Sequence, residues 1–152
     1  HSMTKGLLFL IAGQIVLTYR SKKIAEVQGL LKTLPATGIL FAVGGLAIMG
    51  SPPFSLFISE FLILRDGFAN GHPIVMSLYL FFLSVIFVSM SKSFFDMIQG
   101  EKKELPQKID RYGLMMFSPL VFALIVFLLG VYLPSPLVAF LKEASDLLGK
   151  PL

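Results

Sequence analysis

The sequence predicts an all-α membrane protein, a bundle of about four transmembrane helices with one helix broken over residues 50–54. Hydrophobic residues make up 55% of the chain and charged residues only 14%, whereas a soluble domain carries about 25% charged residues. Four apolar segments account for the difference, and each approaches or exceeds the roughly 20 residues that a spanning helix requires. They lack the period-two alternation of membrane strands, so helices are expected. The segments cover residues 3–19, 34–68, 73–98 and 112–133.

The first segment carries two polar side chains near its start. His1 and Lys5 are four residues apart and therefore share one face of a helix. A lysine at a helix end commonly extends to the membrane surface, whereas a lysine deep in a bundle is usually functional. We expect the helix to continue upstream of His1, which would place Lys5 deep. The alternative is that His-Ser-Met is a vector remnant and Met3 the true start.

The second segment contains the strongest signal in the chain. No charged residue occurs between Lys32 and Glu60, and Gly50, Pro52 and Pro53 interrupt the apolar run. Proline lacks an amide hydrogen and clashes with the preceding turn, so a continuous helix is excluded. A broken membrane helix with an ionisable residue near the break is typical of a transport site, which makes Glu60 the leading candidate. The serine just before it and the backbone freed at the break are expected to hold water near the carboxylate.

The loop charges decide how often this second segment crosses the membrane. If residues 50–53 formed a hairpin between two spans, the basic loops 20–32 and 96–111 would face opposite sides. If residues 34–68 form one broken span, both loops share a side, as the positive-inside rule expects. We therefore predict one broken span and two cytoplasmic loops, and these loops explain the net charge of +4 without a nucleic-acid partner.

The last two segments carry weaker candidates. Lys92 lies near the end of segment 73–98 between Ser91 and Ser93, where extension to the surface competes with a role in a proton path. Pro119 indicates a first helical turn or a kink in the fourth segment. Residues 137–148 form an amphipathic pattern that predicts a helix on the membrane surface.

Several chemistries have no residues to support them. The chain has no cysteine and only two histidines, and it contains no nucleotide-binding or metalloprotease motif. We expect no metal site and no cofactor in this chain. Any redox reaction would belong to partner subunits, because we expect no redox centre in this chain, and the residues leave open whether the chain is part of an enzyme.

Two spaced motifs give the chain a resemblance to a known family. The run His1-Ser-Met-Thr-Lys5-Gly-Leu-Leu-Phe9, and the pattern that ends in Gly50-x-Pro52-Pro53-Phe54 and Phe57-x-Ser59-Glu60-Phe61, resemble two consecutive helices of antiporter-like membrane subunits. These are the proton-pumping subunits of respiratory complex I, of membrane-bound hydrogenases and of multisubunit Na⁺/H⁺ antiporters. The residues of the second motif are similar to those of the component F type of hydrogenase-4 and formate hydrogenlyase complexes.

The resemblance implies a function and a place in a larger protein. Family members have about fourteen helices in two inverted repeats, and residues 1–152 would form a single membrane domain made of the last four. Glu60, Lys5 and His1 would then be stations of a proton path in the inner membrane, with Lys92 a weaker candidate. Other membrane subunits of a hydrogenase or of a complex I-like assembly would be the partners, and the ion would be H⁺ or Na⁺.

Two alternatives remain open at this point. One is a subunit of a multisubunit Na⁺/H⁺ antiporter that is not driven by a redox reaction, because the partners rather than this chain carry that difference. The other is a membrane fragment that transports nothing. The amino-acid sequence does not separate these possibilities from the redox-driven pump.

Overall fold

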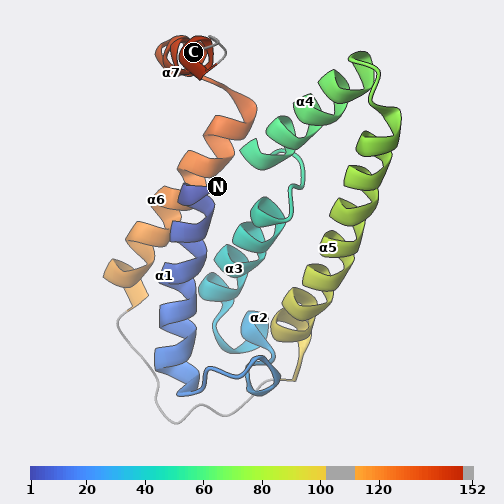
Figure 1. The fold of residues 1–152 in the computed structure, drawn as a ribbon. Coiled ribbons are helices and arrows are strands. Elements are labelled where there is room, and N and C mark those ends of the chain that lie inside the picture. Colours follow the sequence, from blue (N-terminus) through green and yellow to red (C-terminus); the bar gives the residue numbers. More distant parts are fainter. Residues whose placement is uncertain (102–111, 149–152) are drawn as a thin grey trace.

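The computed structural model describes residues 1–101 and 112–148, and within these ranges the chain is helical with no strand. Figure 1 shows the long helices as a splayed bundle, with α7 lying across one end. The elements are α1 (Ser2–Tyr19), the short 3₁₀ turn η1 (Ile24–Glu26), α2 (Leu30–Thr33), α3 (Pro35–Ile48), α4 (Ser55–Ala69), α5 (Pro73–Gln99), α6 (Tyr112–Val131) and α7 (Ser135–Leu148). The predicted all-helical bundle is confirmed.

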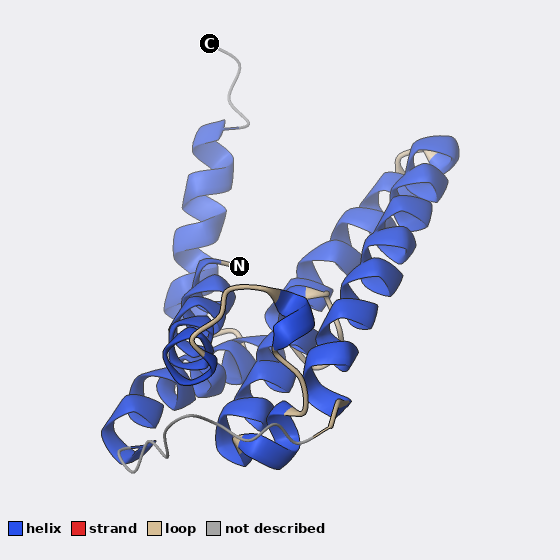
Figure 2. Ribbon diagram, turned by 90° about the horizontal axis from the view of Figure 1, so that it is seen from below, coloured by secondary structure: helices blue, strands red, loops and turns tan. Residues whose placement is uncertain are grey.

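Helix α1 lies antiparallel beside α6, and α3 packs against α1 on one side and α5 on the other (Figures 1 and 2). The inner face of α1 is built from Leu7, Ile11 and Ile15, which repeat every four residues and are at most 3% exposed. This spacing places them on one stripe of the helix. The stripe packs with Leu34 and Phe41 to form the main core.

Two adjacent glycines bring α3 close to both of its neighbours. A Cβ atom on Gly44 would meet the side chain of Leu8 in α1, and one on Gly45 would meet the ring of Phe94 in α5. The Phe94 ring also stacks on Phe41, with 4.6 Å between ring centroids. Small residues allow such close approach, as is common where membrane helices pack.

The break falls where the prolines predicted it. Helix α3 ends at Ile48 and α4 begins at Ser55, and Gly50 adopts a positive φ of 70°. Figure 1 shows α4 continuing beyond α3 in the same general direction before it turns into α5. The segment 34–68 therefore follows one interrupted path along the bundle and does not fold into a hairpin of two helices.

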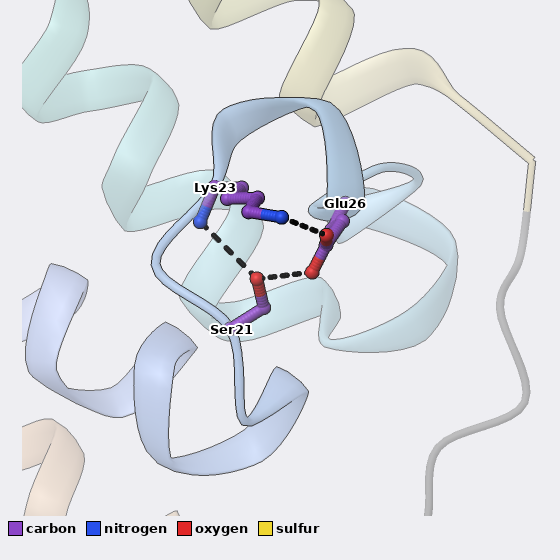
Figure 3. Close-up of polar contacts among 3 residues, drawn as sticks. All are labelled: Ser21, Lys23 and Glu26. Carbon is purple, nitrogen blue, oxygen red and sulfur yellow. Dashed lines mark hydrogen bonds and ion pairs between the residues drawn. The ribbon is translucent and has the colours of Figure 1, made fainter.

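The first basic loop and the described start of the second, Gly100 and Glu101, lie together at one end of the bundle. A Cβ on Gly29 would overlap the Glu101 carbonyl, and one on Gly100 would lie 2.5 Å from the Gln28 side chain. In the first loop Lys23 pairs with Glu26 at 3.3 Å, and Glu26 also accepts a hydrogen bond from Ser21 (Figure 3). Lys102, Lys103, Lys108 and Arg111 of the second loop lie outside the described residues.

By length and apolarity, α1 and α5 are long enough to cross a membrane, and α6 with α7 would make a third crossing if the bent pair counted as one span. The two members of that pair are bent by 74°, so α7 leaves the direction of the bundle. Helix α3 is apolar but shorter, because the break at residues 49–54 ends it. The predicted surface helix at 137–148 corresponds to α7, which begins at Ser135.

A polar contact joins α1 to α6 where proline disturbs the helix. Pro119 lies inside α6, and without an amide hydrogen it cannot bond to the Met115 carbonyl four residues earlier. The side-chain amide of Gln14 in α1 donates to that carbonyl oxygen at 2.6 Å. Pro119 therefore marks a site of interhelical bonding and not only a kink.

We expect Gly130→Ala to destabilise the protein, because α6 passes directly over the break. A Cβ at this position would overlap the carbonyl oxygen of Pro53 and the backbone of Phe54. Overpacking of this kind costs about 1–3 kcal/mol, so the Tm of the complete protein in detergent should fall by several degrees. Gly113→Ala in the same helix meets nothing within 4 Å and should leave Tm unchanged. Equal Tm values for the two variants would contradict this packing.

Cysteine labelling of the complete protein in intact cells would test whether α3 and α4 together make one membrane crossing. The chain contains no native cysteine, so single cysteines at Lys22, Gln99 and Asn70 report one position each. The cysteines at positions 22 and 99 should either both be labelled or both be protected from a membrane-impermeant reagent. The cysteine at position 70, in the α4–α5 turn, should give the opposite result. Opposite accessibility of Lys22 and Gln99 would restore the hairpin alternative.

Candidate functional site

Glu60 lies on the second turn of α4, and its carboxylate folds back towards the break. A Cβ added to Gly50 would overlap the Glu60 carboxylate, so the carboxylate rests against the bare backbone of this glycine. Any other residue at position 50 would occupy that space. Gly50 therefore serves two purposes, because its positive φ also forms the turn that ends α3.

The carboxylate lines a cavity of about 310 Å³ between α3, α4 and α5. Its walls are mostly apolar, and Glu60 is the one ionisable group among the described residues that line it. Ser84 of α5 adds a hydroxyl, which donates to the Leu80 carbonyl at 2.8 Å and keeps its own oxygen lone pairs for another donor or an ion. The lining residues are Ile48, Met49, Gly50, Phe57, Glu60, Phe61, Leu64, Leu80, Leu83, Ser84, Ile86, Phe87 and Val88.

The break also frees backbone acceptors at this cavity. Pro52 and Pro53 have no amide hydrogen, so the carbonyl oxygens of Ile48 and Met49, four residues earlier, lose their helical partners. Both of these residues line the cavity with Glu60. On α5, the Ser91 hydroxyl donates to the Met49 sulfur at 3.3 Å, which ties the end of α3 to the neighbouring helix.

Helix α6 holds the other side of the break. Phe54 is 6% exposed and meets Phe127 edge to face, with 6.3 Å between ring centroids. Phe54 also joins Ala47 and Val126 in a small buried cluster. Irregular backbone within a membrane must be covered by protein or line a wet cavity, and here α6 covers one side while the cavity occupies the other.

The structure does not gather all of the predicted site residues. His1, the N-cap of α1, and Lys5 in its first turns are exposed, and Lys92 is exposed on α5 one turn before Asp96. None of these three lines the cavity of Glu60. Ser59 is exposed, donates to the Leu56 carbonyl at 2.8 Å and is not among the residues that line the cavity, and its expected part in holding water near Glu60 stays a prediction. The roles of Lys5, His1, Glu60 and Lys92 stay predictions.

Ser84 and the two freed carbonyls of α3 were missed from the sequence. Counting back four residues from Pro52 and Pro53 identifies Ile48 and Met49 directly, so that signal was available. Ser84 carried no comparable signal, because a serine in an apolar helix commonly bonds to its own backbone. Its place at the cavity depends on how α5 packs against α4.

Comparison with known proteins decides the family. Residues 1–87 match the transmembrane family described as NADH:quinone oxidoreductase/Mrp antiporter. The chain belongs to this family. This assignment confirms the resemblance to antiporter-like subunits, and the matched region ends in α5, so it includes Lys5, the break and Glu60.

Relatives of this antiporter family come from several kinds of complex. The chain is 34% identical to a hydrogenase-4 component F homolog of Methylacidiphilum infernorum, over 97% of this chain and 30% of the relative. It is 29% identical to the D component of the Na(+)/H(+) antiporter of Bacillus subtilis, over 99% of this chain and 31% of the relative. The L component of the NADH-quinone oxidoreductase of Campylobacter jejuni is 32% identical over 83% of this chain and 22% of the relative.

A solved structure of the Mrp complex from Dietzia sp. DQ12-45-1b has the same fold, with a TM-score of 0.74 at 18% identity over 86% of this chain and 33% of the other. The chain thus spans about a third of the length of the antiporter-like proteins it matches. Family membership and fold make it an antiporter-like membrane subunit, and ion transport fits this assignment.

Proposed function

We propose that this antiporter-like chain is part of a proton-translocating membrane subunit of a redox-driven complex, of the membrane-bound hydrogenase or NADH dehydrogenase-like kind. The observation that carries the proposal is Glu60, which lines a mostly apolar cavity at the helix break and is the one ionisable group there in the part of the chain that the structure describes. Ionisable groups within apolar membrane helices usually mark ion pathways, and Glu60 is partly buried. The 34% identity to a hydrogenase-4 component F homolog supports the redox-driven reading.

In the proposed mechanism, Glu60 takes up and releases a proton as the charge near it changes. An opposite charge close to a carboxylate favours its ionised form, and removal of that charge favours protonation. Lys5 and His1 of α1 would supply changing charge and a group that titrates near neutral pH. Other membrane subunits would cover the exposed faces of α1 and α5 in the inner membrane, with loops 20–32 and 96–111 in the cytoplasm.

A second candidate function is a subunit of a multisubunit Na⁺/H⁺ antiporter. The match to the antiporter's D component along 99% of this chain favours it. Inverted membrane vesicles that contain the complete assembly would separate the two. Proton uptake driven by an electron donor supports the redox-driven pump, and proton movement that needs an opposing Na⁺ gradient but no donor supports the antiporter.

Lys5→Ala in the complete subunit should lower proton translocation severalfold while the complex still assembles. Lys5→Arg should restore little, because arginine holds its proton at any accessible pH. The measurement is proton uptake by vesicles normalised to complex content. Lys32→Ala, an exposed lysine of α2, is the matched control and should transport normally. If Lys5→Ala transports at the native rate, Lys5 carries no proton and instead extends to the membrane surface.

A further inference from the structure

A second cavity, separate from that of Glu60, lies at the end of the bundle that carries the first basic loop. It has a volume of about 180 Å³ and forms where the last turns of α1 meet this loop, α3 and α5. None of its lining residues lines the cavity of Glu60. What the second cavity binds is therefore independent of the proposed function.

The floor of this second cavity is apolar and belongs to the protein core. Ile15, Val27 and Phe41 line it and are at most 7% exposed. On its outer side Ala12 is exposed and Val16 is half-buried, so the described chain leaves this side open. From Ala12 to the end of α1 the helix rises about 10 Å, at 1.5 Å per residue. The cavity is thus an apolar groove along α1, and we call it the α1 groove.

The end of the α1 groove nearest the loop is cationic. Lys22 and Lys23 are among its lining residues, which include no acidic residue. Lys23 pairs with Glu26 at 3.3 Å, whereas Lys22 is exposed and forms no ion pair with another residue that the structure describes. Asp96 and Glu101, at the end of α5, line a different cavity. A positive charge therefore remains at the end of an apolar groove.

Hydrogen bonds within the loop hold Lys22 at this position. The Ser21 hydroxyl accepts from the backbone amide of Lys23 at 3.1 Å and donates to the Glu26 carboxylate, which also pairs with the Lys23 ammonium (Figure 3). Lys22 lies between these two bonded residues, so its backbone is fixed while its ammonium is left for a ligand. Ile24 also lines the groove and is 55% exposed, which places a large apolar side chain beside the charge.

A ligand that fits the α1 groove combines an anionic head with an apolar tail. A free phosphate ion would use the charge of Lys22 and leave the apolar walls uncovered. Water is also a poor occupant, because an apolar cavity of about 150 Å³ can stay dry and bind an apolar molecule instead. The cytoplasmic leaflet, on the side where we place loop 20–32, is rich in anionic lipids, and basic pockets between membrane helices on that side bind lipid headgroups.

We propose that the α1 groove binds an anionic phospholipid of the leaflet on the side of loop 20–32. The lipid phosphate lies at the Lys22 ammonium, and one acyl chain runs along Ala12 and Val16 over the apolar floor. The lipid fills the space between α1 and the loop, so it joins the end of α1 to the turn that leads into α3.

The test uses the purified complete complex in vesicles that contain phosphatidylglycerol and phosphatidylcholine, one of which carries a photoactivatable diazirine on its acyl chain. After illumination, mass spectrometry of the tryptic peptide of residues 6–20, which contains Ala12 and Val16, measures the lipid bound there. One lysine close to an anionic lipid supplies a preference of about fivefold. The phosphatidylglycerol probe should therefore label this peptide about fivefold more than the phosphatidylcholine probe, and high salt should reduce the ratio by screening the charge.

Variants separate the headgroup contact from the apolar contact. Lys22→Gln should bring the ratio of the two probes close to one, whereas Lys32→Gln, at an exposed lysine outside the groove, should keep it. Ala12→Phe, at an exposed position, should reduce labelling by both probes, because the ring occupies the groove. Inorganic phosphate, at an ionic strength matched with NaCl, should not compete.

Three results would overturn the lipid site. Equal labelling of the native complex by the two probes would show that the groove does not select an anionic lipid. Absence of labelling by both probes would show that protein outside residues 1–152 covers the groove. A ratio that inorganic phosphate abolishes, or that Lys22→Gln leaves unchanged, would show that Lys22 does not hold a lipid phosphate.

Discussion

Glu60→Gln is expected to reduce proton translocation by the assembled complex to the level of vesicles that lack it. Glutamine keeps the shape of the side chain but cannot ionise. Its amide can donate a hydrogen bond without carrying a charge, and the end of α3 at Ile48 and Met49 lines the same cavity, so the variant should be at least as stable as the native protein. Loss of transport together with an undiminished Tm would separate ionisation from folding.

The measurement is proton uptake by reconstituted vesicles, with complex content determined in parallel. Glu143→Gln is the matched control, because Glu143 is exposed on α7 and lies outside the cavity of Glu60. It should transport at the native rate. Glu60→Asp should retain part of the activity, since it keeps the carboxylate but shortens its reach. If Glu60→Gln pumps at the native rate, Glu60 is structural and the proposed proton path is wrong.

Gly50→Ala is expected to reduce transport nearly as much as loss of the carboxylate. The added Cβ would overlap the Glu60 carboxylate, which must then move away from the end of α3. The positive φ of 70° adds a backbone cost of about 1–2 kcal/mol for alanine. Gly50 acts through Glu60, so it is a positioning residue.

Gly71→Ala provides the control for backbone strain. Gly71 has a similar φ of 79°, but a Cβ there meets nothing within 4 Å. Both variants should lose a few degrees of Tm, and only Gly50→Ala should lose transport. Combining Gly50→Ala with Glu60→Asp should recover part of the activity, because the shorter acid avoids the new methyl group. Equal transport losses at positions 50 and 71 would mean that strain alone explains the effect.

The sequence predicted those parts of the fold that depend on local chemistry and on the membrane. Two prolines forbid a helix wherever they occur in mid-span, so the break was placed correctly between α3 and α4. The loop charges also favoured one interrupted segment over a hairpin, which agrees with the direction that α4 takes beyond α3. The helix ends were accurate to within a few residues, as with α5, which extends to Gln99.

Other parts depend on contacts between distant residues and were not predicted. Nothing near Gln14 indicates that it bonds to the Met115 carbonyl, 101 residues away. The short elements η1 and α2 form where the chain must turn between two packed helices, and neither has a strong local pattern. For the same reason the candidate site was predicted as far as Glu60 and the break, but Ser84 was not.

The cover that α6 provides has a consequence for how the protein is made. Phe54 enters the membrane well before Phe127, which packs on it, has been synthesised. At about 5–20 residues per second, the newly made break stays without this neighbour for several seconds. Backbone groups exposed to lipid cost several kcal/mol each. During biogenesis, therefore, the insertion machinery or an earlier helix must shield the break until α6 arrives, and chains that end before α6 should be targets for membrane quality control.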